Sequence, residues 1–310
     1  AGGTNLSDTR MLTGASTSFD PQLFLEIDAY AEHLLNGTAF EENKYFPNEV
    51  AQWLEGWGKA ALWNLAKAKS RASYPKAPAF RRFEADVAIQ GGMGLFFGRK
   101  FRSAVLWAIY QKTGDINAKT AALAQYESAR QVWSDVAAVA TPVYKPDLTY
   151  GRGGRNRGHW KDRLKGIDSD LAAMNKGEVV GTPTHPGSAS EAIATVQKRL
   201  ARPAANCHHD APNTFAAGQP LTIVLNTDGA ETTCVNLYYR HVNQADAWQV
   251  IPMEVMNGGF QATIPGSYTR TDYPLQYYFG LAKGKSGSVL FPGFDANLAN
   301  QPYFVVRLET

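Results

Sequence analysis

One stretch of the chain, residues 150–160, gathers side chains that could bind an oxygen-rich ligand. It contains three arginines, a histidine, an asparagine and two aromatic residues among four glycines. Arginine presents a planar fork of donors that fits a carboxylate or sulfate, and a tyrosine or tryptophan ring can pack on the apolar face of a sugar. The alternative is a solvated loop whose arginines pair with acids of neighbouring helices. The predicted ligand-binding residues, for an acidic or neutral glycan, are Tyr150, Arg152, Arg155, Asn156, Arg157, His159 and Trp160.

Catalysis would require a further set of groups. A lyase acting on acidic polysaccharides needs a cation or amide that neutralises the uronate, together with a base and an acid. The loop has those types in Tyr150, Asn156, Arg157 and His159. Glycoside hydrolysis needs two carboxylates about 5 to 9.5 Å apart. No spacing singles out a pair among the available acids Glu84, Asp86, Asp162, Asp168 and Asp170, so no catalytic residue is assigned.

Two other motifs could suggest a metal or a cofactor. Residues 207–210 read Cys-His-His-Asp, but a zinc site usually needs a second, separated group of ligands. A linker that carries a thiol, or a disulfide from Cys207 to Cys234, explains this run better. Residues 91–94 are rich in glycine but lack the lysine of a phosphate loop and the dinucleotide fingerprint. We therefore expect close helix packing there, and neither a metal nor a cofactor.

Composition narrows the class of protein. The chain has 310 residues, of which 44% are apolar and 19% charged, which suits a folded protein with a substantial core. A net charge of +3 argues against a dedicated nucleic-acid binder. No run approaches the roughly 20 apolar residues of a membrane-spanning helix. The first residues show no signal peptide and no initiator methionine, which indicates a mature form or an excised fragment.

The first two-thirds of the chain, which contains the predicted binding stretch, is expected to be helical. Apolar residues recur at helical spacing, and proline or glycine marks the ends of the segments. Trp53, Trp57 and Trp63 share one such segment, where core packing is the expected role and a sugar-stacking surface the alternative. Short connections favour antiparallel helices. The expected helices span residues 20–35, 48–73, 80–112, 117–140, 159–175 and 188–201.

After Pro203 the apolar residues alternate with period two, which predicts strands. The expected strands span residues 221–225, 235–240, 248–251, 259–264, 275–279 and 304–308. Six short strands separated by turn residues favour an immunoglobulin- or fibronectin-like sandwich. The fold is thus expected to be α+β, with an antiparallel helical bundle at 1–202, a linker at 203–212 and the sandwich at 213–310. Neighbouring aromatics such as Tyr238 and Tyr239 should send one ring inward and one outward, toward a glycan or toward the helical domain.

Several segments together resemble the C-terminal accessory part of large bacterial carbohydrate-active, glycoside hydrolase-like proteins. They are residues 102–107 with 113–115, residues 157–164, and residues 273–279 with 291–294. The resemblance implies a secreted or periplasmic, non-catalytic accessory or interaction region that follows a catalytic domain and associates with carbohydrate. The alternatives are a stand-alone polysaccharide-degrading enzyme, with a lyase preferred over a hydrolase, and a structural scaffold without a ligand.

Overall fold

The computed structural model describes residues 23–38, 43–149, 157–202, 205–227, 232, 234–282 and 288–309. The chain is α+β and divides into two compact units. We call the first the helical unit; its described residues are those up to Gly37 and those between Tyr45 and Leu200. The second, the β unit, takes the described residues of Thr38–Lys44 and those after Ala201. The chain therefore passes between the units three times.

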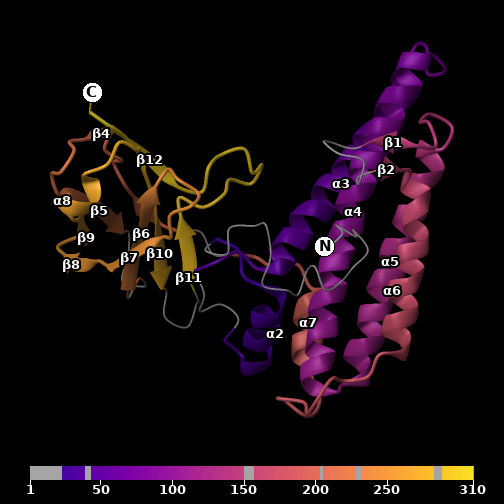
Figure 1. The fold of residues 1–310 in the computed structure, drawn as a ribbon, viewed down its shortest axis with the longest axis horizontal. Coiled ribbons are helices and arrows are strands. Elements are labelled where there is room, and N and C mark those ends of the chain that lie inside the picture. The colour runs from indigo at the N-terminus through magenta and orange to yellow at the C-terminus, as the bar shows by residue number, and fades with distance from the viewer. Residues whose placement is uncertain are drawn as a thin grey trace. The chain divides into compact units, whose positions relative to one another are not determined.

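Three long helices dominate the helical unit (Figure 1). They are α3 (Pro47–Arg71), α4 (Pro78–Thr113) and α5 (Ile116–Ala140), and the shorter helices are α2 (Ile27–Asn36), α6 (Leu164–Lys176) and α7 (Ser190–Gln197). Proline occupies the first position of α3 and of α4, where its missing N–H costs nothing. Gly114, in the left-handed conformation at φ 74°, ends α4, and the Asp115 side chain caps α5 by accepting a hydrogen bond from the Asn117 N–H.

The glycine-rich part of α4 is a region of close helix packing. A Cβ atom built on Gly58 of α3 would lie 2.5 Å from the carbonyl oxygen of Gly91 in α4. On Gly98 it would lie 2.8 Å from the carbonyl oxygen of Ala51. Earlier residues of α3 thus meet later residues of α4, and the two helices run antiparallel. The structure agrees with the expected close approach, and α4 continues unbroken through residues 91–94.

Two expectations for the helices are wrong. The first helix was expected from residue 20, but α2 begins only at Ile27, because the backbone before it pairs with Tyr45 in a short bridge. The tryptophans of α3 were expected in the core, but Trp57 is 54% exposed and Trp63 is 59% exposed. The inward face of α3 is taken by small residues that let α4 approach, so these large rings lie outside it. Trp53 instead packs edge-on against the Tyr45 ring, with centroids 5.2 Å apart.

The core of the helical unit centres on Trp133 of α5, which is 2% exposed. Its ring lies 4.7 Å from that of Phe96 in α4, and its Nε1–H donates a 2.8 Å hydrogen bond to the Trp160 carbonyl oxygen. Trp160 begins a short 3-10 helix, η1 (Trp160–Arg163), which leads into α6. The core thus extends from the long helices to Trp160, the last residue of the predicted binding loop.

Two sheets form the β unit (Figure 1). One has the order β4–β12–β10–β6–β7, with β11 also paired to β10; the other has the order β3–β5–β9–β8. All neighbours are antiparallel except β12 and β4, which are parallel. The elements are β3 (Cys207–His208), β4 (Thr214–Phe215), β5 (Leu221–Thr227), β6 (Cys234–His241), β7 (Gln249–Pro252), β8 (Glu254–Met256), β9 (Gly259–Ile264), α8 (Gly266–Thr269), β10 (Leu275–Ala282), β11 (Ser288–Phe291) and β12 (Phe304–Leu308).

Both sheets contribute to one apolar core. Ile223 of β5 and Phe260 of β9 belong to the same cluster as Leu237 of β6 and Phe279 of β10. Because side chains alternate along a strand, the neighbours of Leu237 and Phe279 lie on the opposite side of their sheet. Arg202 adds a polar tie within this unit, since its guanidinium donates to the carbonyl oxygens of Lys44 and Ser288.

His209 lies at the edge of this core as a neutral ring. Its Nδ1 is 2.6 Å from the Val224 carbonyl oxygen, which can only accept, so Nδ1 carries the hydrogen. Its Nε2 then accepts from the Tyr277 hydroxyl at 2.8 Å. The rings of Phe279 and Phe304 lie 5.0 and 4.8 Å away. Burial in these surroundings lowers the pKa of His209 and raises the pKa of Tyr277.

This environment predicts that acid weakens the β unit through His209. The unfolded chain takes up a proton near the usual pKa of 6.5, whereas the native ring resists protonation. Below that pH the unfolded state binds more protons, so the free energy of unfolding falls as the pH drops toward the lowered native pKa. Urea unfolding between pH 8 and pH 5 should show a steeper loss for the natural protein than for His209→Gln.

The matched control is the exposed neighbour His208. His208→Gln should keep the pH dependence of the natural protein, because that side chain is 69% exposed. Equal slopes for the natural protein and His209→Gln would contradict the assignment.

The two cysteines are not joined. Cys207 in β3 and Cys234 at the start of β6 belong to different sheets, and no disulfide links these two described residues. The Cys207 side chain is therefore a thiol, carried by strand β3.

Candidate functional site

The predicted binding loop is only partly within the described residues. Tyr150, Arg152, Arg155 and Asn156 lie outside them. The predicted stretch begins directly after β1 (Leu148–Thr149) and includes β2 (Arg157–Gly158), which pairs antiparallel with β1. The remaining predicted residues, Arg157, His159 and Trp160, can be placed, and each has a contact within the helical unit.

Arg157 forms a two-pronged ion pair with Asp147. Its Nε lies 2.9 Å from Oδ1 and its terminal nitrogen 2.7 Å from Oδ2 of that carboxylate. The hydrogen bond from Arg157 lowers the pKa of Asp147, and the carboxylate in turn raises the pKa of Arg157. Both side chains are more than half exposed. An acidic ligand at Arg157 would therefore have to compete with a carboxylate that is already in place.

His159 and Trp160 anchor the end of the loop. The His159 ring is 4% exposed; its backbone N–H donates to the Asp162 carboxylate at 2.7 Å, and its Nδ1 accepts from the Lys161 N–H. The Trp160 ring lies 5.3 Å from that of Tyr144 and packs on the apolar residues between α4 and α5. His159 Nε2 is buried without a hydrogen-bond partner among the described residues. These contacts fix the N-terminal end of η1. Ligand binding by the loop stays a prediction.

The acids considered for hydrolysis each have a partner within the helical unit. Asp162 caps η1, and Asp86 accepts a hydrogen bond from the Tyr144 hydroxyl. The others hold helices together through the pairs Glu84 with Lys69, Asp168 with Arg130, and Asp170 with the Tyr126 hydroxyl. Each of these five carboxylates thus has a structural role, and none is singled out as a catalytic group.

A different set of residues gathers on the outer side of the six-stranded sheet. We call it the outer aromatic face and define it as Tyr238, Arg240, Trp248, Gln276 and Tyr278. The register pairs Tyr278 with Tyr238 and Gln276 with Arg240, and Trp248 directly precedes β7, the next strand. Inward-facing residues alternate with these along β6 and β10. These five side chains therefore lie on the side of the sheet away from its core, where the Gln276 amide is itself buried at 4% exposure.

The contacts within the outer aromatic face are tight. Tyr238 stacks on Tyr278 with centroids 4.8 Å apart and planes 6° apart, and Trp248 meets Tyr278 edge-on at 5.0 Å. The Arg240 guanidinium lies 4.5 Å from the Trp248 ring centroid, a cation–π contact. With its amide turned to satisfy both groups, Gln276 accepts hydrogen bonds from Arg240. Tyr278 is fully buried under its neighbours, while Tyr238, Arg240 and Trp248 stay partly open to solvent.

The margins of this face are apolar and open. Val250 of β7 is opposite Tyr238 and is 49% exposed, and Val305 of β12 is opposite Gln276 and is 41% exposed. A ligand with an apolar face and a hydroxyl edge could pack on the rings and bond with the polar groups beside them. Sequence alternation predicted one outward ring in each aromatic pair, but the register was needed to bring Trp248 and Arg240 to the same place.

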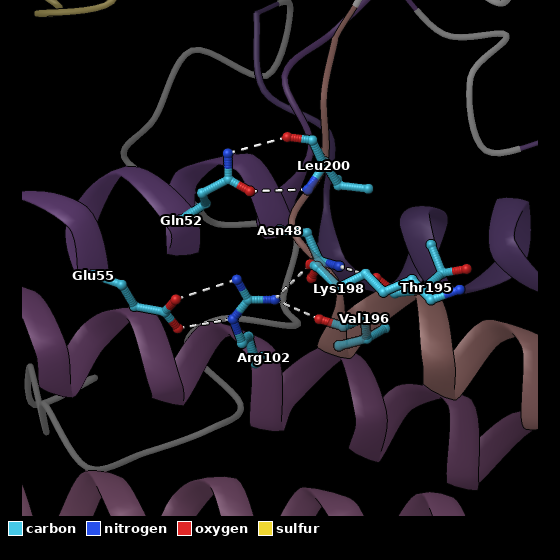
Figure 2. A network of polar contacts seen from close by, with 8 residues as sticks. All are labelled: Asn48, Gln52, Glu55, Arg102, Thr195, Val196, Lys198 and Leu200. Atoms are coloured by element: carbon cyan, nitrogen blue, oxygen red, sulfur yellow. Dashed lines mark hydrogen bonds and ion pairs between the residues drawn. The ribbon is translucent and has the colours of Figure 1, made fainter.

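A buried polar network in the helical unit was not predicted at all (Figure 2). Arg102 of α4 donates through Nε and a terminal nitrogen to the two oxygens of Glu55, at 2.7 and 3.2 Å. Its other terminal nitrogen donates to the carbonyl oxygen of Val196 and, more weakly, to that of Lys198. The guanidinium thus joins α3 and α4 to the segment that leaves α7.

Two amides extend this network along the same segment. The Gln52 side chain donates to the Leu200 carbonyl oxygen at 3.1 Å and accepts from the Leu200 N–H at 2.9 Å. Asn48 donates to the Thr195 carbonyl oxygen at 3.4 Å. Figure 2 shows these side chains aligned along residues 195–200. The Gln52 amide and the Asn48 amide nitrogen all bond to backbone groups, so we call this network a clamp.

The described residues contain no group of three histidine, cysteine or acidic side chains placed to hold a metal ion. None of the described helices is long and apolar enough to cross a membrane.

Comparison with known proteins found similarity only among solved structures. No family model matches the chain, and no curated protein matches it. Among solved structures, the chain is similar to a GH138 enzyme targeting pectin rhamnogalacturonan II, with a TM-score of 0.42 and 9% sequence identity. The likeness covers 77% of this chain and 34% of that enzyme, so this chain spans about a third of the enzyme's length.

Proposed function

We propose that this chain is a non-catalytic, carbohydrate-associated interaction region and that its outer aromatic face binds the glycan. The observation that carries the proposal is the pair of partly exposed rings, Tyr238 and Trp248, which both pack on Tyr278, with the Arg240 guanidinium over the Trp248 ring. Rings supply flat apolar contact with little loss of conformational freedom, and the polar groups give direction to hydroxyl contacts. The partly exposed rings and the Arg240 guanidinium are the features that support pyranose binding here.

We also propose an immunoglobulin- or fibronectin-like sandwich for the β unit. The sheet orders support it: β3–β5–β9–β8 corresponds to the A–B–E–D order of that fold, and β12–β10–β6–β7 to G–F–C with an added C′ strand. In that frame the outer aromatic face lies on the C–F pair, β6 and β10. These central strands are paired on both sides, so the binding surface has a rigid base.

The wider setting is part of the same proposal. The segments at residues 102–107, 157–164 and 273–279 resemble accessory parts of large bacterial carbohydrate-active proteins. We therefore place this chain in a larger secreted protein, where it would hold a catalytic domain close to its polymer. In that setting, binding by this chain would raise the local concentration of substrate without chemistry of its own.

Substitutions in the outer aromatic face test the proposal. Trp248→Ala removes a stacking surface worth roughly 0.5–1.5 kcal/mol, so affinity for an oligosaccharide selected on a glycan array should fall about two- to tenfold. Arg240→Ala should lower it as well, because the guanidinium orients Trp248. Isothermal titration calorimetry on the full chain gives the affinities.

The matched control is Tyr273→Ala, since Tyr273 is a tyrosine of the same unit that is 52% exposed and outside the face. It should leave affinity unchanged. Circular dichroism should show that all three variants are folded. No glycan bound by the natural protein, or equal losses for Trp248→Ala and Tyr273→Ala, would refute the proposal.

A further inference from the structure

The connection between α3 and α4 carries an unusual concentration of positive charge. We call residues 57–86 the α3–α4 tip; they lie at one end of the helical unit (top in Figure 1). The tip holds seven basic and two acidic side chains, a net charge of +5, whereas the whole chain has a net charge of +3. The rest of the chain is therefore slightly negative. The basic residues, all exposed, are Lys59, Lys67, Lys69, Arg71, Lys76, Arg81 and Arg82.

Most of this charge is not used within the fold. Lys69 pairs with Glu84, and the other six basic side chains have no ion-pair partner among the described residues. Lys69 and Arg71 lie at the C-terminus of α3, where the helix dipole favours cations. Arg81 and Arg82 lie near the N-terminus of α4, where the dipole disfavours cations, and the first turn there has no acid. Helix stability therefore does not explain these two arginines.

Exposed aromatic rings are interleaved with the charges. Trp57, Trp63, Tyr74 and Phe83 are 54%, 59%, 81% and 53% exposed. The Lys67 ammonium lies 3.4 Å from the centroid of the Trp63 ring, so cation and ring form one contact surface. Leaving such large rings in contact with water is unfavourable, and a ligand that covers them would gain free energy by burying their apolar surface.

We propose that the α3–α4 tip is a second binding site, for an acidic polysaccharide. Its uronate carboxylates would pair with Arg81, Arg82 and the lysines, and its sugar rings would pack on the exposed aromatics. The exposed rings beside the charges favour a chain of sugar rings over duplex DNA, whose bases are stacked away from such contacts. The inference does not depend on glycan binding by the outer aromatic face.

The test measures binding of polygalacturonate to the full chain at low and at physiological ionic strength. An uncharged glucan, a single-stranded oligonucleotide and vesicles with anionic lipid serve as comparison ligands. We expect the natural protein to bind polygalacturonate most tightly, with an affinity that falls as salt rises. Arg81→Glu with Arg82→Glu should lower this affinity by about tenfold at low salt, since two attractions become repulsions.

The matched control is Lys165→Glu with Lys176→Glu, two exposed lysines of α6 outside the tip. It changes the net charge by the same amount and should leave the affinity within about twofold if binding is local. The tip variant should stay folded, because acidic residues near the N-terminus of α4 suit its dipole. Trp248→Ala should leave binding of polygalacturonate at the tip intact, which separates this site from the outer aromatic face.

Four results would overturn the proposal. They are an absence of binding to polygalacturonate, equal losses in the tip and control variants, equal affinity for the uncharged glucan, and tighter binding to the oligonucleotide or the vesicles. Trp63→Ala with Phe83→Ala supplies a further check, since it should weaken binding at high salt, where the charges are screened.

Discussion

Arg102→Ala is expected to lower the free energy of unfolding of the helical unit by roughly 3 kcal/mol, near the low end for a broken buried ion pair. The Arg102 side chain is 9% exposed and its partner Glu55 is 19% exposed. Removal of the guanidinium leaves the carboxylate partly buried without its counter-ion and deprives the Val196 carbonyl oxygen of its donor. Urea unfolding followed by far-ultraviolet circular dichroism measures the change.

The chain offers a matched control in Arg130, whose pair with Asp168 has the same chemistry but is 37% and 49% exposed. Arg130→Ala should cost at most about 1 kcal/mol, because water screens exposed pairs. Arg102→Ala should also make residues 195–200 more sensitive to proteases, since their backbone loses the clamp. Similar losses of stability for the two arginines would show that burial does not strengthen the Arg102 pair.

Trp133→Ala should have an effect of about 3–5 kcal/mol, as expected for a buried tryptophan whose removal leaves a cavity. The ring is 2% exposed and packs against Phe96. Its Nε1–H also fixes the Trp160 carbonyl oxygen, so the variant loses the link between α5 and η1. Thermal unfolding followed by circular dichroism measures the loss.

Trp133→Phe separates the two contributions of this side chain. It keeps an aromatic ring near Phe96 but cannot donate to Trp160, so it should retain much of the stability that alanine loses. Trp57→Ala provides the exposed comparison on the same unit and should change stability by only a few tenths of a kcal/mol. A loss below about 1 kcal/mol for Trp133→Ala would contradict the central place of Trp133 in the core.

Local patterns predicted the elements well where a proline, a glycine or strict alternation marked them. The expected helix 117–140 differs from α5 by one residue at its start, because Asp115 is a strong cap. The expected strand 259–264 coincides with β9, where alternation is regular. The first helix failed, since the bridge from Phe24 to Tyr45 joins residues far apart in the chain and leaves no local pattern.

The candidate sites were harder to predict because they depend on contacts between elements. Periodicity placed Trp57 and Trp63 on a helix, but it could not show that small residues would occupy the packed face of α3. Arg102 closely follows Arg99 and Lys100 in the sequence, and only its contacts with Glu55 and Val196 give it a distinct role. The outer aromatic face required the register of β6 with β10, which alternation within each strand does not determine.

Because the chain crosses between its two units three times, genetic recombination cannot easily separate them. The β unit needs the Thr38–Lys44 segment as well as the residues after Ala201, and within it Asn43 lies so close to Gly280 that a Cβ there would be 2.5 Å from the amide nitrogen. A single exchange of genetic material at residue 200 would therefore deliver a β unit without one of its pieces. Recombination can move the two units as a pair far more easily than it can separate them, and descendants of this gene should carry both or neither.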